Sequence, residues 1–113
     1  LLADEGTLVL KFFLHIDAAE QKSRLEVRLK DPSKQWKLQA SDLDDRANWN
    51  DFIKAYEEAL GRTSTAHAPW YVVPANKKWY RNVVVATIVR EALDRLKPEY
   101  PPLPAALAGV TGV

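Results

Sequence analysis

The hydrophobic pattern predicts that strands and helices alternate along this chain. Residues 7–16 (TLVLKFFLHI) form a nearly continuous apolar run that is rich in β-branched and aromatic side chains. A continuous rather than alternating run is typical of a strand covered on both faces, as in a parallel α/β sheet. Asp17 and Glu20 follow in a D-x-x-E capping pattern, which predicts a helix over residues 18–29. Pro32 ends this helix because the residue before a proline avoids the helical conformation.

A second helix is predicted after a short loop. Residues 33–40 show no periodicity and are predicted to form that loop. Ser41 offers a helix cap, and a clear apolar stripe continues from there to Leu60. Gly61 supplies the expected stop.

The last third of the chain predicts a strand, a helix and a tail. Residues 70–73 are a short apolar strand closed by a proline, and residues 79–96 are predicted to form a third helix. Residues 98–113 are rich in proline, alanine and glycine and are expected to be a flexible or extended arm. Two strands joined through helices call for a parallel crossover, and two strands are too few for a stable sheet. We therefore expect further strands upstream of Leu1.

Composition narrows the class of protein. The chain has 113 residues, of which 47% are hydrophobic and 27% charged, with a formal net charge of +1. Bulk charge therefore predicts neither nucleic-acid nor membrane binding, and no run approaches the roughly 20 apolar residues of a membrane span. The chain has no cysteine, which excludes disulfides and thiolate metal sites and suits a cytoplasmic protein. It also has no methionine, even at position 1, so we interpret it as a fragment or a processed product.

The most informative polar residues are basic. Arg24 and Arg28 come just after the end of the first strand, and Lys34 and Lys37 lie in the following loop. Ligands of doubly wound α/β folds bind at the carboxyl ends of the strands, and guanidinium groups clamp phosphates there. The alternative is that both arginines belong to the solvated side of an amphipathic helix, paired with its glutamates. The pattern alone favours this alternative.

Other chemistries find less support. His15 and His67 are far apart and lack ligand-like neighbours, which argues against a metal site. Ser64 and His67 could belong to a nucleophilic arrangement, but no nucleophile elbow accompanies them. Trp36 and Trp79 are the candidates for stacking on bases, and the other two tryptophans are expected in the core. Neither a G-x-x-x-x-G-K-[ST] loop nor a convincing Walker B aspartate is present, so the chain does not contain a complete phosphotransfer site.

Three stretches in order resemble the polyphosphate kinase type 2 family: KFFLHIDAAEQKSRLEVRLKDPSKQWKL, SDLDDRANWNDFIKAYEEAL and STAHAPWYVVPANKKWYRNVVVATIV. The resemblance covers residues 1–96, and W-K-L followed by A-P-W-Y-V-V is its most specific part. That family is similar in architecture to thymidylate kinases. The resemblance implies an α/β fold of the partial P-loop-kinase-like, three-layer type with a parallel sheet, lacking its N-terminal half. Residues 1–97 would be the C-terminal part of the kinase domain, with a mobile lid at about 30–62, and residues 98–113 the tail.

The same resemblance implies an activity and a set of contacts. The activity is transfer of a phosphoryl group between inorganic polyphosphate and a nucleoside mono- or diphosphate. It would use Mg²⁺ held by ligands upstream of this chain, which would itself supply no catalytic or metal-binding residue. The phosphate-binding residues would be Arg24, Arg28, Lys34, Lys37 and Arg46, and the nucleotide-binding residues Asn76, Lys77 and Lys78. A homo-oligomer is expected. The alternatives are a fragment of a thymidylate-type nucleotide kinase and a non-catalytic interaction module.

Overall fold

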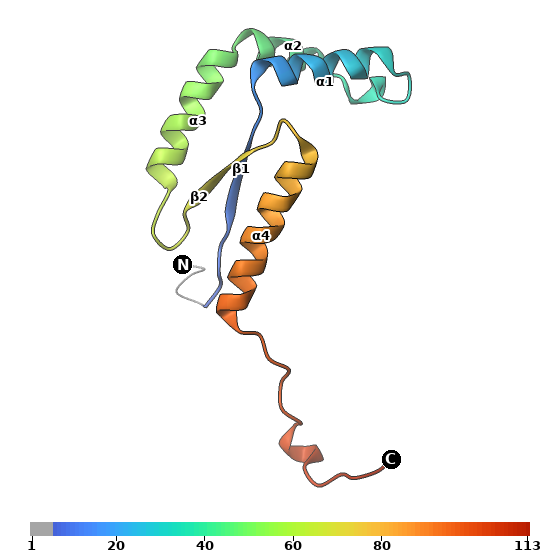
Figure 1. Cartoon of the computed structure of the whole chain (residues 1–113), viewed down its shortest axis with the longest axis vertical. Helices are drawn as coiled ribbons and strands as arrows, with labels where there is room; N and C mark the ends of the chain where they lie inside the picture. Colours follow the sequence, from blue (N-terminus) through green and yellow to red (C-terminus); the bar gives the residue numbers. More distant parts are fainter. Residues whose placement is uncertain (1–5) are drawn as a thin grey trace.

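The computed structural model describes residues 6–113 as an α/β chain with two strands and four helices. In chain order the elements are β1 (Lys11–His15), α1 (Ala18–Lys30), the 3₁₀ helix η1 (Gln35–Lys37), α2 (Ala40–Ala47), α3 (Trp49–Thr63), β2 (Trp70–Pro74), α4 (Lys78–Leu96) and the 3₁₀ helix η2 (Ala105–Leu107) (Figure 1). The described part is elongated, with extents of 67 × 38 × 23 Å and a radius of gyration of 21.6 Å. A compact domain of this length would have a radius of gyration of about 13 Å.

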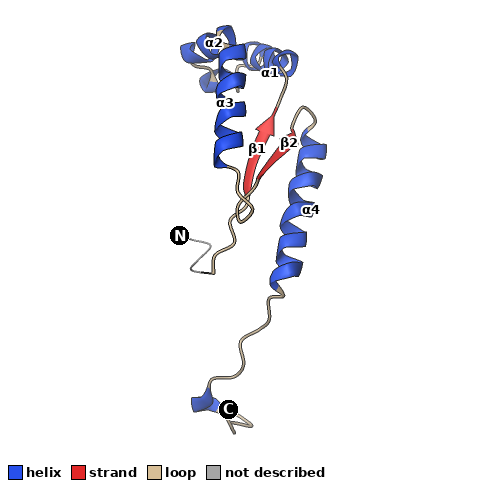
Figure 2. Cartoon of the chain, turned by 90° about the vertical axis from the view of Figure 1, so that its left-hand side faces the viewer, coloured by secondary structure: helices blue, strands red, loops and turns tan. Residues whose placement is uncertain are grey.

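The two strands pair in parallel, as the sequence predicts. Phe13 lies opposite Val72, and His15 lies opposite Pro74. Figure 2 shows α3 on one side of the strands and α4 on the other. Because parallel strands run in the same direction, the carboxyl ends of β1 and β2 meet at one edge of the sheet. The chain enters α1 after β1 and α4 after β2, so both helices begin at that edge.

The first strand is shorter than its apolar run. Residues 7–16 were predicted to be one strand, but only Lys11–His15 pairs, because β2 offers five residues as partner. Leu14 is 48% exposed. The continuous apolar run predicts a strand that is covered on both faces, but within the described residues β1 is only partly covered.

The predicted helix from Ser41 to Leu60 is two helices. The break is at Asn48, whose side-chain amide donates to the Asp44 carbonyl at 3.0 Å and competes with the helical backbone. α2 starts one residue before Ser41, and its cap is Gln39, whose backbone N–H donates to an Asp42 carboxylate oxygen at 2.9 Å. The predicted loop over residues 33–40 also contains one 3₁₀ turn.

The predicted stop at Gly61 is wrong. α3 continues through Gly61 to Thr63, whose hydroxyl donates to the Ala59 carbonyl at 2.6 Å. The helix ends at Ser64, which turns into an extended conformation while its N–H still donates to the Leu60 carbonyl. Gly61 does not adopt the left-handed conformation that gives glycine its advantage at a helix end.

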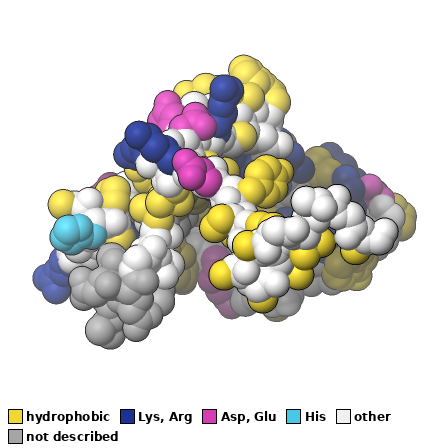
Figure 3. Space-filling view, turned by 90° about the horizontal axis from the view of Figure 1, so that it is seen from below, with side chains coloured by type: hydrophobic (Ala, Val, Ile, Leu, Met, Phe, Trp, Pro, Cys, Tyr) yellow, Lys and Arg dark blue, Asp and Glu magenta, His cyan; other side chains and the backbone are white. Residues whose placement is uncertain are grey.

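The buried core is small. Within residues 6–113 the fully buried apolar side chains are those of Val73, Ala75 and Ala92, which lie in β2, just after it and in α4. Hydrophobic side chains instead spread over the surface, as the yellow atoms in Figure 3 show. Within the same residues no helix combines the length and apolar character needed to cross a membrane.

The tail runs away from the rest of the molecule. α4 ends where Lys97 adopts the left-handed conformation, with φ of 48°. Residues 98–113 then extend beyond the helices and contain η2 (Figure 1). The first five residues of the predicted 1–97 unit lie outside the described residues.

Candidate anion-binding site

The carboxyl edge of the sheet is tied together by side chains that follow the two strands. Asp17 caps α1 as the D-x-x-E pattern predicts, because its carboxylate accepts a hydrogen bond from the Glu20 N–H at 2.7 Å. The same carboxylate accepts a hydrogen bond from the Asn76 side chain, which follows β2. Hydrogen bonds from the Glu20 N–H and then from Asn76 lower the pKa of Asp17 below its ordinary value of 3.8. An ionised carboxylate therefore joins the two strand ends.

Arg24 connects α1 to the turn after β2. Its Nε donates to a carboxylate oxygen of Glu20 at 2.9 Å, and its Nη2 donates to the backbone carbonyls of Ala75 at 2.7 Å and Asn76 at 3.2 Å. The ion pair with a glutamate of the same helix, which the solvated-face alternative predicts, is therefore present for Arg24. That alternative does not describe Arg28 in the same way, since Glu26 pairs with Lys22.

The lysines of the predicted lid lie on a hydrogen-bonded turn. Asp31 accepts hydrogen bonds from the hydroxyl and the N–H of Ser33 at 2.7 and 3.0 Å. Those bonds lower the pKa of Asp31, and Lys34 adds to the effect from 3.7 Å away. The Trp36 indole N–H donates to the Ser33 carbonyl at 2.9 Å, and Lys37 Nζ lies 5.4 Å from the centre of the Trp36 ring. Hydrogen bonds within the turn itself therefore fix the backbone that carries Lys34 and Lys37.

A cavity of about 500 Å³ lies between α1, this turn and the start of α4, and its lining is strongly basic. It is lined by Glu20, Ser23, Arg24, Val27, Arg28, Lys34, Lys37, Lys78 and Arg81. Six of these side chains are cationic. Glu20 is the one carboxylate among the described lining residues, and it is already paired with Arg24. We name this space the basic cavity. Like charges gathered around one hollow repel each other, so an anion in the hollow is favoured.

The structure brings together four of the five predicted phosphate-binding residues. Arg24, Arg28, Lys34 and Lys37 all line the basic cavity. Arg46 does not line it: its guanidinium donates to the Ala18 carbonyl at 2.9 Å and the Gln21 side chain at 3.3 Å, which ties α2 to the first turn of α1. The Arg46 side chain therefore forms its hydrogen bonds outside the basic cavity.

The three predicted nucleotide-binding residues are consecutive, but they have different surroundings. Asn76 pairs with Asp17, Lys77 is the cap residue of α4, and Lys78 lines the basic cavity beside the predicted phosphate-binding residues.

Arg81 is a cavity residue that sequence reasoning missed. It lies three residues after Lys78, so both side chains occupy one face of α4. The available signal was the parallel pairing itself, which places the start of α4 next to the start of α1. α4 also begins without a side-chain cap and without an acidic residue in its first turn, so basic side chains dominate its amino end.

The candidate base-stacking tryptophans are exposed. Trp36 is 77% exposed, and Trp79 is 64% exposed with its ring edge-on to Tyr80. Trp70, which was expected in the core, is partly buried, and its indole N–H donates to the Thr63 hydroxyl at 2.8 Å.

The basic cavity offers one carboxylate, that of Glu20, as a possible metal ligand among its described lining residues. Among residues 6–113 no group of three or more histidine, cysteine, aspartate or glutamate side chains is placed to hold a metal ion. Mg²⁺ prefers several oxygen ligands, and the single carboxylate of the basic cavity is paired with Arg24.

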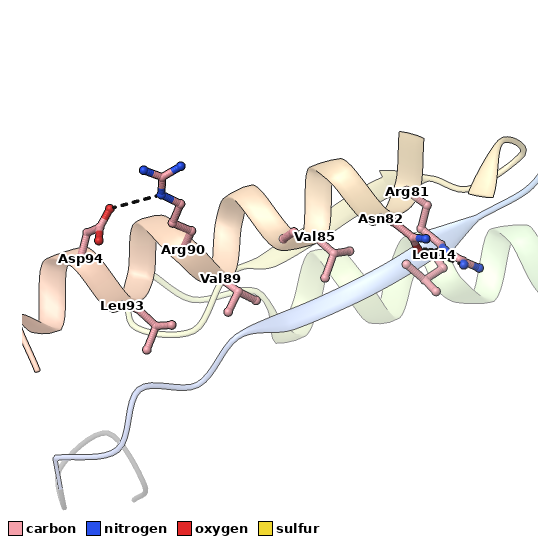
Figure 4. Close-up of a pocket in the computed structure, with 9 residues that line it drawn as sticks. Leu14, Arg81, Asn82, Val85, Val89, Arg90, Leu93 and Asp94 are labelled. Carbon is pink, nitrogen blue, oxygen red and sulfur yellow. Dashed lines mark hydrogen bonds and ion pairs between the residues drawn. The ribbon is translucent and has the colours of Figure 1, made fainter. Parts of the chain in front are cut away.

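A second, apolar hollow of about 750 Å³ lies between β1 and α4 (Figure 4). Leu14 of β1 and Val85, Val89 and Leu93 of α4 line it, and Figure 4 shows Leu14 at the same end as Arg81. Because Arg81 lines both hollows, the basic cavity and the apolar hollow adjoin along α4.

Comparison with known proteins places these features in a family. The family described as Polyphosphate kinase 2 matches residues 1–101. An AMP/ADP-polyphosphate phosphotransferase of Meiothermus ruber is 54% identical over 101 residues, which is 89% of this chain and 38% of that protein. An ADP-polyphosphate phosphotransferase of Rhodopseudomonas palustris is 42% identical over 96 residues, covering 85% of this chain and 33% of that protein.

A solved structure agrees with the fold. The crystal structure of Polyphosphate Kinase 2 from Arthrobacter aurescens aligns with a TM-score of 0.88 at 47% identity, covering 91% of this chain and 37% of that chain. The chain thus spans between 33% and 38% of the length of these proteins.

Proposed function

Because this chain belongs to the Polyphosphate kinase 2 family, we propose that the full-length protein containing it transfers a phosphoryl group between inorganic polyphosphate and a nucleoside mono- or diphosphate. The names of the relatives in Meiothermus ruber and Rhodopseudomonas palustris, which specify AMP, ADP and polyphosphate, support both substrate classes. Family membership argues against a thymidylate-type kinase, for which ATP would be the donor.

The basic cavity is the observation that carries the proposal. Polyphosphate is a linear chain of anions, and six cationic side chains around one hollow match such a ligand in charge. The six cations come from three places: Arg24 and Arg28 from α1, Lys34 and Lys37 from the turn after α1, and Lys78 and Arg81 from α4. Phosphoryl transfer depends chiefly on positioning and on offsetting charge over the phosphate oxygens. Arginine forks would orient the phosphate chain, and the lysines would add point charges.

The proposal extends to parts that these residues do not supply. The phosphate-binding loop, the Mg²⁺ ligands and the remaining strands of a P-loop-kinase-like domain would come from other parts of the full-length protein. Mg²⁺ would supply charge neutralisation at the transferring phosphate. The segment 30–62 would act as a lid that carries Lys34 and Lys37 over the substrate. A homo-oligomeric state and a cytoplasmic location belong to the same proposal, and a chain without cysteine is in keeping with that location.

The decisive test is an assay of the purified full-length protein with polyphosphate, Mg²⁺ and AMP or ADP. We expect formation of the next higher nucleotide, separated and quantified by ion-exchange chromatography. The variant Arg28→Ala should lose most of this activity. The variant Lys22→Ala changes a cation of the same helix outside the basic cavity and should keep it. Absence of product with polyphosphate, together with product from ATP as donor, would contradict the proposal.

A further inference from the structure

Arg24 lines the basic cavity, but most of its hydrogen-bonding capacity points elsewhere. Its Nε is occupied by Glu20, and its Nη2 is shared by the carbonyls of Ala75 and Asn76. The side chain is only 28% exposed, and Ala75 is 1% exposed. These contacts join residues 51 and 52 positions apart in sequence, so they connect two separate elements rather than one helix face.

Arg24 bonds to the turn that connects β2 to α4 and sets the position of the start of α4. Residues 75–77 connect β2 to α4, and Lys77, the cap residue of α4, makes no side-chain capping bond. The turn is instead fixed from outside, by Arg24 on its carbonyls and by the pairing of Asn76 with Asp17. Lys78 and Arg81 follow directly, and both line the basic cavity. A shift of the turn would therefore move two cavity cations together.

We propose that Arg24 is a positioning residue: by holding the carbonyls of Ala75 and Asn76 it places Lys78 and Arg81 in the basic cavity, and it does not itself bind the phosphate chain. This inference rests on the proposed function, which makes polyphosphate the ligand of the cavity. It departs from the sequence-based assignment of Arg24 as a phosphate contact. Both donor forks of a guanidinium, Nε with Nη2 and Nη1 with Nη2, include Nη2, and in Arg24 this nitrogen already donates to the two carbonyls.

The first readout needs no ligand. The Arg81 N–H donates to the Lys77 carbonyl at 3.1 Å in the first turn of α4, so its hydrogen exchange reports how firmly that turn is held. In the full-length protein, Arg24→Ala should speed exchange at Arg81 by about tenfold, as expected for losing a charge-assisted hydrogen bond. Asn76→Ala should act in the same direction without removing a charge. Lys22→Ala, on the same helix as Arg24, should leave the exchange rate unchanged.

The second readout is the affinity for inorganic polyphosphate in a double-mutant cycle. Arg24→Ala should weaken binding by about tenfold in the otherwise natural protein, but by less than about twofold when Lys78→Ala and Arg81→Ala are already present, because the residues act as one unit. Arg24→Lys keeps the charge but replaces two separate guanidinium nitrogens, which bond Glu20 and the two carbonyls, with a single ammonium nitrogen, so it should bind as weakly as Arg24→Ala.

Three results would overturn the inference. They are an equal loss of affinity in both backgrounds, recovery of affinity in Arg24→Lys, and an unchanged exchange rate at Arg81 in Arg24→Ala. Any one of them makes Arg24 a direct contact or a bystander. If the unsubstituted protein fails to bind polyphosphate, the proposed function is wrong. The exchange measurement then still decides whether Arg24 positions the turn, so the two failures are distinguishable.

Discussion

Asp17 and Asn76 are 59 residues apart in sequence and form a reciprocal pair of hydrogen bonds. The Asp17 backbone N–H donates to the Asn76 side-chain oxygen at 3.1 Å, and the Asn76 side-chain amide donates to the Asp17 carboxylate at 2.9 Å. The pair closes the carboxyl edge of the parallel sheet, on which the basic cavity is built. Because one partner is an ionised carboxylate, the closure depends on pH.

The first prediction concerns acid stability. The pKa of Asp17 is lowered in the folded protein from 3.8, first by the Glu20 N–H and then by Asn76. Its contribution to the free energy of unfolding is therefore fully present above pH 3.8 and is lost as the pH falls through the lower folded value. Thermal unfolding measured as a function of pH should show this loss of stability. The Asp17→Asn variant should lose less stability in acid, because the part due to Asp17 is already absent. An identical acid profile for Asp17→Asn and the unsubstituted protein would rule the effect out.

The second prediction concerns catalysis by Arg28. In the full-length protein, Arg28→Ala should raise the activation free energy by about 2–4 kcal/mol, comparable to removing one preorganised donor from a charged transition state. Arg28→Lys should recover only part of the rate, because it keeps the charge without the bidentate fork. Steady-state kinetics with polyphosphate, beside thermal unfolding of each variant, measure the two effects. A cost of about 0–1 kcal/mol would instead assign Arg28 to the solvated helix face.

The third prediction concerns the salt dependence of polyphosphate binding. Each cation that contacts a linear polyanion releases counterions, so the slope of log affinity against log salt counts the contacts. Lys78→Ala should reduce the steepness of that slope by roughly 0.7, the value per phosphate contact for single-stranded nucleic acid. Arg46→Ala should leave it unchanged, because Arg46 is bonded to Ala18 and Gln21 outside the cavity. A slope that Lys78→Ala does not change would remove Lys78 from the binding site.

The fourth prediction concerns the 113-residue chain by itself. Within its described residues the buried side chains are three small ones, Val73, Ala75 and Ala92, and Leu14 in β1 is half exposed. Such a chain should self-associate or fold only partly, since the cover of its apolar surface and strand edges is incomplete within the described residues. Sedimentation velocity and thermal unfolding test this. A monodisperse monomer with a sharp cooperative transition would count against it.

The fifth prediction concerns the segment proposed as a lid. Trp36 is 77% exposed beside Lys37, so closure over polyphosphate should change the environment of its indole. Tryptophan emission of the full-length protein should shift on adding polyphosphate, and most of the shift should disappear in Trp36→Phe. The same shift in that variant would show that the signal comes from another tryptophan.

The sequence alone determined the features that depend on near neighbours. The D-x-x-E pattern predicted the start of α1 at Ala18, and Pro32 predicted its end, because capping bonds and proline sterics act within a few residues. The apolar runs predicted both strands, and the helical segments between them indicated a parallel connection. The break at Asn48 and the extension through Gly61 escaped prediction, since single polar bonds rather than the apolar stripe decided them.

Only the tertiary structure decided which residues share the site. Parallel pairing brought the start of α4 to the start of α1, so Lys78 and Arg81 joined Arg28 around one cavity. It also gave Arg24 two carbonyls to hold and drew Arg46 to the Ala18 carbonyl instead. Spacing along a chain fixes the direction of a side chain on its own helix, but the partner it meets depends on contacts between segments distant in sequence. Those contacts separate the residues proposed to bind phosphate from those that hold the site in place.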